Sequence, residues 1–115
     1  MKYTRVYTDE QGESKFEDVM IDLKDHGTIG WLSNVYTVKE LQFRRNPADY
    51  DWDFHHAPAR QFIILLDGEI AITTSTGETR QFRGGDILLM DDTHGKGHKT
   101  KNIKSQIRHS IFIKI

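Results

Sequence analysis

The 115-residue chain contains no cysteine. This absence excludes disulfide bonds, thiolate nucleophiles and the zinc and iron–sulfur sites that cysteine builds. Any metal would have to be bound through nitrogen and oxygen atoms. The chain also has almost no excess of one charge, because 16 basic residues stand against 17 acidic ones and the net charge is −1. That balance gives no basis for a nucleic acid or an anionic membrane as the main partner.

Long apolar runs are absent as well. The longest, residues 62–66, is far shorter than the roughly 20 residues needed to span a bilayer. The first residues, MKYTRVYTDEQGE, are polar and lack the apolar core of a signal peptide. We therefore expect a cytoplasmic protein without a membrane partner. Its length predicts one domain over residues 1–115, with residues 1–15 as a polar lead-in.

Short apolar stretches, broken by glycine, aspartate, asparagine and threonine, dominate what remains. This pattern is typical of β-barrels and sandwiches. Strands are predicted over residues 16–23, 35–43, 61–66, 69–74, 78–82, 87–90 and 106–115, with a loop over residues 44–51. Asp67-Gly68 predicts a tight type I′ hairpin, and Ser75-Thr76-Gly77 predicts a second hairpin. The sequence thus predicts an all-β fold closed into one barrel.

Two segments carry four of the six histidines. The first reads DFHHAPARQFIILLDG over residues 53–68, and the second reads GGDILLMDDTHGKGHKTKN over residues 84–102. Each places histidine and other polar residues beside an apolar run and a glycine turn. Inside a small barrel, the two segments can bring His55 or His56, Gln61 and His98 around one cavity. They predict a pocket for a small molecule or a metal and leave the ligand open.

The two segments resemble the two motifs of the cupin superfamily, whose members are small jelly-roll barrels. Gln61 stands where the first motif has a glutamate, and Gly68 follows at the expected spacing. The GKGH stretch at 95–98, followed by Asn102, is similar to the second motif. The stretches PARQF and GGDILLMDDTHGKGH also resemble one group of small single-domain cupins. The resemblance implies an all-β double-stranded β-helix, the jelly-roll or cupin barrel.

The resemblance also implies a possible divalent metal, whose ligands here depart from the motif. The motif places its histidines two positions apart, whereas His55 and His56 are adjacent and should point to opposite faces of a strand. If His55 faces inward, Asp53 lies on the same face and takes the place of the first histidine. Asp53, His55 and His98, with Gln61 as a weaker fourth ligand, would match many non-haem iron sites. Such donors suit iron, manganese, nickel and zinc alike. The alternative is a metal-free pocket in which the histidines form hydrogen bonds.

Four residues beside the motifs are candidates for ligand binding: Trp52, Arg60, Thr93 and Lys96. Arg60 could clamp a carboxylate, or it could be exposed or at a subunit contact. Lys96 lies between glycines that would let the backbone approach a ligand, or it lies in a flexible hairpin loop. Trp52 could line the mouth of the pocket or belong to the core, and Thr93 occupies the position of a motif proline. No catalytic residue is assigned.

Three functions are open at this point. The barrel could bind a small anionic or carbonyl-bearing molecule, or it could be a metal-dependent oxygenase or isomerase acting on a small carbonyl or carboxylate compound. It could also be a non-catalytic regulatory or structural dimer, because a fold does not fix a function. A homodimer is expected in each case. The resemblance implies pairing through sheet edges or an exchanged N-terminal strand, and exposed strand edges need covering.

Overall fold

The computed structural model describes all 115 residues, and nearly all of its regular structure is β-strand. The strands in chain order are β1 (Lys2–Thr8), β2 (Ser14–Met20), β3 (Lys24–Asp25), β4 (Trp31–Leu32), β5 (Glu40–Asn46), β6 (Asp51–His55), β7 (Gln61–Leu65), β8 (Glu69–Thr74), β9 (Thr79–Arg83), β10 (Ile87–Asp91), β11 (His98–Asn102) and β12 (Arg108–Lys114). One 3-10 turn, η1 (Gly27–Ile29), lies between β3 and β4. The structure contains no helix with the length and apolar character that a membrane crossing requires.

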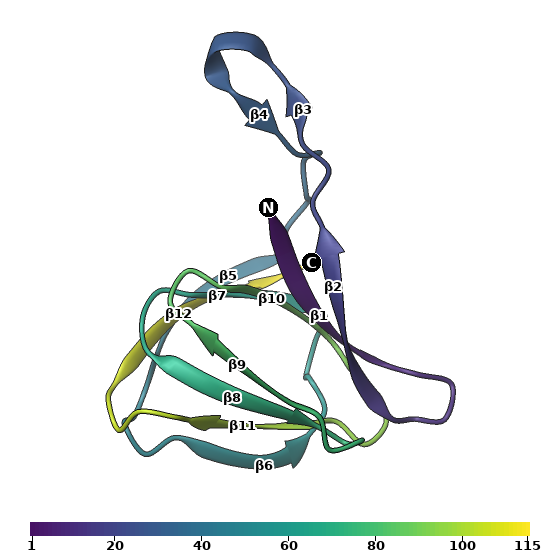
Figure 1. The fold of residues 1–115 in the computed structure, drawn as a ribbon, viewed down its shortest axis with the longest axis vertical. Coiled ribbons are helices and arrows are strands. Elements are labelled where there is room, and N and C mark those ends of the chain that lie inside the picture. Colours follow the sequence, from purple (N-terminus) through teal and green to yellow (C-terminus); the bar gives the residue numbers. More distant parts are fainter.

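Two layers of sheet form the barrel (Figure 1). One layer has six strands in the order β2-β1-β10-β7-β12-β5, and the other has four in the order β6-β11-β8-β9. Strands that follow one another in the chain often lie in different layers, as β7 and β8 do. This interleaving gives the all-β jelly-roll barrel that the sequence predicts.

The core lies between the layers because side chains alternate along each strand. In β7, Ile63 and Leu65 face the interior, whereas Phe62 and Ile64 face outward. The most deeply buried apolar residues come from both layers and include Val6, Leu65, Ile70, Ile72, Leu88 and Met90. One continuous core therefore holds the two sheets together.

The N-terminal residues differ from the prediction of a polar lead-in. Lys2–Thr8 forms β1, which pairs in parallel with β10 and antiparallel with β2. Val6 is fully buried, but the strand otherwise carries polar residues that hide its alternation in the sequence. The first fifteen residues are thus part of the barrel.

The turn at Asp67-Gly68 also differs from the prediction. No hairpin forms there, because the flanking strands β7 and β8 belong to different layers. Gly68 has a φ of 71°, but no non-glycine residue has positive φ, so the turn is not of type I′. The predicted hairpin at residues 75–77 is confirmed, since β8 and β9 pair antiparallel on either side of it.

Several strands differ from those that the sequence predicts. The predicted strand over residues 35–43 is shifted to β5, which extends into the predicted loop, and β6 and β11 were not predicted. The displacement arises because residues 21–33 leave the barrel as a projecting arm that contains β3, η1 and β4 (Figure 1). Residues 21–33 are called the arm below.

Candidate functional site

A cavity of about 140 Å³ lies between the two layers. Its polar and aromatic lining consists of Arg44, Tyr50, Trp52, His55, Gln61, His98, Thr100, Arg108 and Phe112. Aliphatic side chains such as Ile63 and Ile72 form the rest of the wall. The structure thus brings His55, Gln61 and His98 to one cavity, together with Trp52.

A β-bulge decides which residues of β6 face this cavity. On β11, His98 pairs with His55 and Thr100 pairs with Trp52, so a single residue lies between the two pairs. On β6, both Asp53 and Phe54 lie between them. The extra residue shifts the alternation, as in any bulge. Trp52, and not Asp53, therefore shares the inner face with His55.

His55 is fixed by contacts on two sides. Its ring stacks on Trp52, with 3.8 Å between the ring centroids and 10° between the planes. Its Nδ1 lies 2.8 Å from the carbonyl oxygen of Asp53. A carbonyl can only accept, so Nδ1 carries the proton and Nε2 keeps its lone pair. Burial, as the largest influence, lowers the pKa of His55, which favours this neutral form.

His98 is held more rigidly than His55. It is almost fully buried, and its Nδ1 lies 2.5 Å from Oδ2 of Asp92, which is completely buried. This contact orients the imidazole and leaves Nε2 as the nitrogen available to the cavity. The centroids of the His55 and His98 rings lie 4.6 Å apart. Two imidazoles thus share one small space.

The other sequence candidates lie outside the cavity. Asp53 is exposed, and its Oδ1 accepts the backbone N–H of Phe54. Arg60 forms an ion pair with Asp91 at 3.2 Å. Lys96 pairs with Glu13, and Thr93 is exposed in the loop after β10. The structure does not bring these four residues, Asp53, Arg60, Thr93 and Lys96, to the cavity.

The residues at the cavity do not fit the iron site that the sequence suggested. That site needs a carboxylate beside two imidazoles, and the cavity lining contains no aspartate or glutamate. Asp92 is engaged by Nδ1 of His98, and no group of three or more histidine, cysteine, aspartate or glutamate side chains is arranged to hold a metal. The two imidazoles and the Gln61 amide are an incomplete donor set.

Two arginines line the cavity that are not among the site residues predicted from the sequence. Arg44 comes from the inner face of β5, and Arg108 from the inner face of β12. In β12 the isoleucines occupy alternate positions, which puts Arg108 and Phe112 together on the opposite face. This alternation in β12 is the sequence signal that indicates a shared face for Arg108 and Phe112. It was missed because an apolar face is ordinarily expected to point into a barrel.

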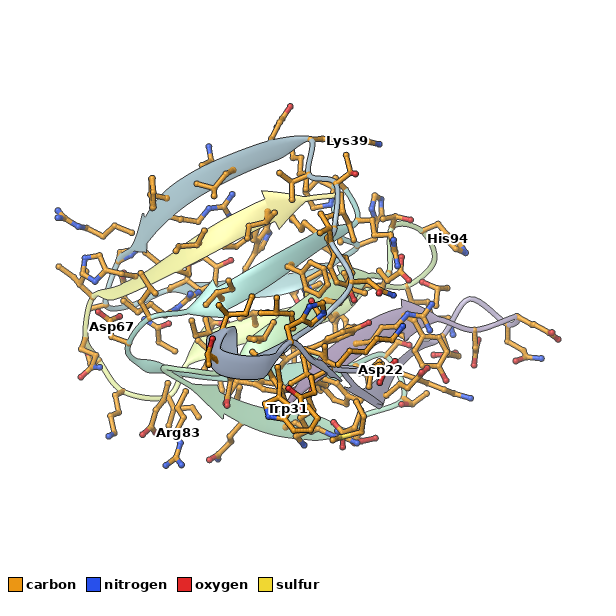
Figure 2. All side chains as sticks on the ribbon, turned by 90° about the horizontal axis from the view of Figure 1, so that it is seen from above. Asp22, Trp31, Lys39, Asp67, Arg83 and His94 are labelled. Carbon is orange, nitrogen blue, oxygen red and sulfur yellow. The ribbon has the colours of Figure 1, made fainter.

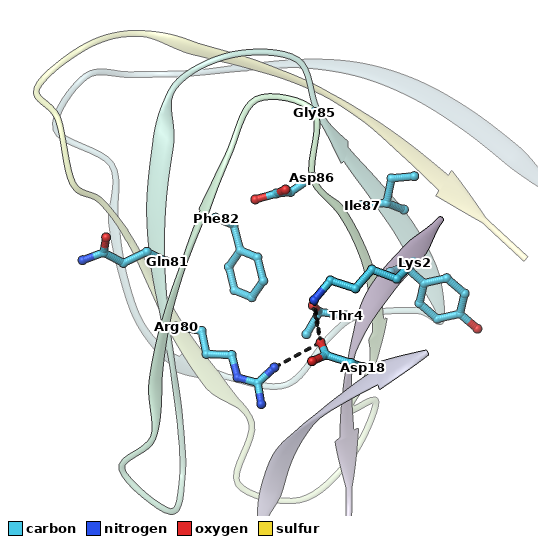
Figure 3. Close-up of a pocket in the computed structure, with 10 residues that line it drawn as sticks. Lys2, Thr4, Asp18, Arg80, Gln81, Phe82, Gly85, Asp86 and Ile87 are labelled. Atoms are coloured by element: carbon cyan, nitrogen blue, oxygen red, sulfur yellow. Dashed lines mark hydrogen bonds and ion pairs between the residues drawn. The ribbon is translucent and has the colours of Figure 1, made fainter. Parts of the chain in front are cut away.

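A second cleft, of about 230 Å³, opens between β9 and the first two strands (Figure 3). Asp18 is one of its lining residues and forms ion pairs with Lys2 at 3.6 Å and with Arg80 at 3.2 Å. Thr4 also donates to Asp18. These charges already satisfy one another, so the cleft offers a ligand less than the barrel cavity does.

The neutral state of His55 makes stability depend on pH. In the unfolded chain a histidine takes up a proton as the pH falls through about 6.5. In the folded chain the pKa of His55 is lowered, so its protonation requires a lower pH. The unfolded state then binds more protons, so acidification destabilises the fold below about pH 6.5.

Thermal unfolding at pH 7.5 and 5.5 should show a smaller fall in Tm for His55→Gln than for wild type. The exposed neighbour is the control, and His56→Gln should keep the wild-type fall. Equal falls in all three proteins would contradict this assignment.

Comparison with known proteins identifies similar structures. No family model matches the chain, and no curated protein matches it. A structure of protein NMB1881 from Neisseria meningitidis matches with a TM-score of 0.51 and 13% identity, covering 65% of this chain and 71% of that one. Drosophila melanogaster CENP-C bound to CAL1 matches with a TM-score of 0.51 and 16% identity over 81% of each chain. The Drosophila melanogaster CENP-C cupin domain matches with a TM-score of 0.50 and 14% identity, covering 82% of this chain and 76% of that one. At such identities the likeness extends to the fold alone.

Proposed function

Because the chain has the cupin fold, we propose that its barrel cavity binds a small organic anion that also carries a hydrogen-bond donor. One observation carries the proposal, namely the buried charge of Arg108. Only 4% of this residue is exposed, and its guanidinium forms no ion pair. Its Nε donates to Oδ1 of Asn102 at 2.8 Å, and its guanidinium carbon lies 4.8 Å from the ring centroid of Tyr50.

Buried charges in proteins are normally paired, because an isolated charge is costly to remove from water. Burial lowers the pKa of Arg108, which reflects this cost. Arg44 lines the same cavity and also lacks an ion pair, with its guanidinium carbon 3.7 Å from the Phe112 ring centroid. No acidic side chain lines the cavity to balance the two. An anionic ligand would supply the missing charge, and a carboxylate matches guanidinium geometry well.

The size of the cavity limits the ligand. A cavity of about 150 Å³ in a protein interior can hold a benzene molecule, and this one measures about 140 Å³. An acid of about six non-hydrogen atoms therefore fits. Ile63, Phe112 and other apolar residues would contact its carbon atoms.

The two imidazoles add a second requirement. Nδ1 of His55 donates to a carbonyl oxygen and Nδ1 of His98 faces a carboxylate. The neutral ring of His55 then offers an Nε2 lone pair, which accepts a hydrogen bond, and Nε2 of His98 is the second imidazole nitrogen that faces the cavity. A ligand with a hydroxyl or amino group beside its carboxylate would satisfy both the arginines and the histidines. This combination distinguishes the proposed ligand class from simple fatty acids.

Three compounds that share a three-carbon skeleton test the proposal by titration calorimetry. Lactate has the charge and the donor, propionate lacks the donor, and lactamide lacks the charge. We expect lactate to bind most tightly. Arg108→Met should weaken lactate binding by about 10- to 100-fold, the value of a hydrogen bond to a charged group. The control Arg83→Met changes an exposed arginine of β9 and should bind lactate as wild type does.

Two results would contradict the proposal. One is equal binding of lactate and lactamide, which would mean that the arginine charge is not used. The other is near-stoichiometric iron, manganese, nickel or zinc in the purified tag-free protein that disappears in a His55→Ala/His98→Ala variant. That metal would make the cavity a metal centre despite its incomplete donor set, and it would favour the metal-dependent enzyme.

A further inference from the structure

A second hollow adjoins the barrel cavity at the edge of the six-stranded sheet. It measures about 390 Å³, and four of its eight lining residues also line the cavity: Arg44, Pro58, Gln61 and Phe112. This second hollow is called the vestibule below. Because the two spaces share half of the vestibule lining, they are neighbouring compartments. A ligand in the cavity can therefore extend into the vestibule.

The vestibule lies at the end of the sheet where β5 begins. Figure 2 shows β5 at the edge of its layer, starting just after Lys39 and running beside β12. The first residues of β5 and the last residue of β12 line the vestibule, namely Glu40, Leu41, Gln42 and Lys114. The arm contributes no residue to the vestibule or to the cavity. The ends of two paired strands thus build this space.

The charged groups of the vestibule leave one arginine without an acidic partner. Nζ of Lys114 lies 2.8 Å from Oε2 of Glu40, and this contact lowers the pKa of Glu40, so the two charges balance each other. Arg44 is the one other charged residue in the lining, and it forms no ion pair. The vestibule therefore carries one excess positive charge, on Arg44.

Arg44 keeps most of its hydrogen-bond donors free. Its guanidinium carbon lies over the Phe112 ring, 3.7 Å from the centroid. All five N–H donors of a guanidinium lie in its plane, so contact through the face leaves them available. One nitrogen donates to Oε1 of Gln42 at 3.1 Å. The remaining edge can bind a carboxylate at the boundary between cavity and vestibule.

Gln61 is a buried amide at the same boundary. It lines both spaces and is only 5% exposed. No hydrogen bond within the chain engages its side chain, although buried polar groups are normally satisfied. An amide offers both donors and an acceptor. It can therefore donate to a carboxylate oxygen or accept from a hydroxyl group where the two spaces meet.

Arg44 and Arg108 present two separate positive charges to one ligand path. Arg44 pairs with Ser110, which lies two residues along β12 from Arg108, so the arginines are diagonal neighbours on one face. Diagonal neighbours in a sheet are about 7–8 Å apart. Burial is the main cause that lowers the pKa of Arg108, and the charge of Arg44 lowers it further. A single carboxylate neutralises only one of these two charges.

We propose that the ligand is a small 2-hydroxy dicarboxylate that spans the cavity and the vestibule. Its hydroxy-acid end occupies the cavity beside Arg108, and its second carboxylate binds Arg44. This inference rests on the anion site proposed above. Malate is the simplest probe, because it is lactate with a second carboxylate in place of one methyl hydrogen. Its lactate-like part fits the cavity, and the added carboxylate extends toward the vestibule.

Titration calorimetry with lactate, malate and the 4-amide of malate tests the proposal. The 4-amide has the size of malate but lacks the second charge. We expect malate to bind about 10-fold more tightly than its 4-amide, the lower end of the effect of a charged hydrogen bond. The lower end applies because Arg44 is half-buried and water partly screens its charge.

Substitutions of Arg44 test which residue reads the second carboxylate. Arg44→Met should bring the preference for malate over the 4-amide close to one. Arg44→Lys keeps the charge but loses the planar fork, so it should retain part of the preference. The preference is a ratio of two affinities in one protein, so a variant that only loosens the site would not abolish it. Circular dichroism should show an unchanged fold.

Arg45→Met is the matched control. Arg45 follows Arg44 in β5, is exposed, and donates from Nε to Nε2 of His109 at 3.4 Å. Its side chain lies on the opposite face of the strand. The variant removes the same charge from the same strand and should keep the wild-type preference. An equal loss with Arg45→Met would show that overall charge sets the preference, and it would overturn the role of Arg44.

Two further results separate this inference from the proposed anion site. Binding of lactate, with malate no tighter than its 4-amide, would overturn the dicarboxylate and leave the anion site intact. Failure of both lactate and malate to bind would contradict the anion site itself, and the dicarboxylate would fail with it.

Discussion

Gly97→Ala should destabilise the fold by about 3–5 kcal/mol, the combined cost of a strained φ and of overpacking. Gly97 has a φ of +72°, which side-chain-bearing residues rarely adopt. A Cβ at this position would lie 2.1 Å from the backbone oxygen of His55 and 2.6 Å from the backbone nitrogen of His56. Backbone atoms cannot rotate away as a side chain can. Chemical denaturation of the wild type and the variant would measure the loss.

Gly77→Ala separates the two causes of this loss. Gly77 also has a positive φ, of +92°, but a Cβ there would meet nothing within 4 Å. It should therefore carry only the conformational cost of about 1–2 kcal/mol. Equal destabilisation by both substitutions would show that the close approach of Gly97 to His55 does not constrain the site.

Asp92→Ala should produce the second large effect, a loss of about 2–3 kcal/mol in unfolding free energy. The substitution removes a completely buried hydrogen-bond partner and leaves Nδ1 of His98 without an acceptor. The imidazole should then populate both tautomers, so Nε2 would no longer be reserved as an acceptor for the ligand. Denaturation measures the first effect, and ¹⁵N chemical shifts of the His98 ring measure the second.

Asp92→Asn is the corresponding conservative change. Its amide oxygen can still accept the Nδ1 proton of His98, so the ring should keep the wild-type tautomer. Its amide group adds a buried donor, and Oδ1 of Asp92 already lacks a partner in the wild type. Some stability should therefore be lost. An alanine variant that keeps a single tautomer would refute the orienting role of Asp92.

The fold and part of the site could be predicted from the sequence because both depend on local patterns of apolar, polar and glycine residues. His55, Gln61 and His98 stand next to apolar runs and glycine turns, and strand alternation turns them from the two layers toward one cavity. The motif resemblance adds the jelly-roll order of strands, which composition alone does not determine. Together they predict the all-β jelly-roll barrel that the structure shows.

The face of β6 on which Asp53 lies could not be predicted, because no sequence pattern reliably identifies a β-bulge. Regular alternation puts Asp53 beside His55, and a single extra residue between the paired positions reverses that assignment. Arg108 was missed for a different reason. The isoleucines of β12 form the apolar half of its alternation, but they face outward, so the expected inside and outside of this strand are exchanged.

The pairing partners of β1, β5 and β6 have a consequence for the order of folding. β5 pairs only with β12, β6 only with β11, and β1 meets the rest of its sheet through β10. A ribosome that has released the first eighty residues has therefore released strands whose partners do not yet exist. Contacts so distant in sequence also form slowly, typically in milliseconds to seconds. Closure of this barrel has to wait for the last strand, and until then the isoleucine- and phenylalanine-rich strands are the part of the chain most exposed to aggregation.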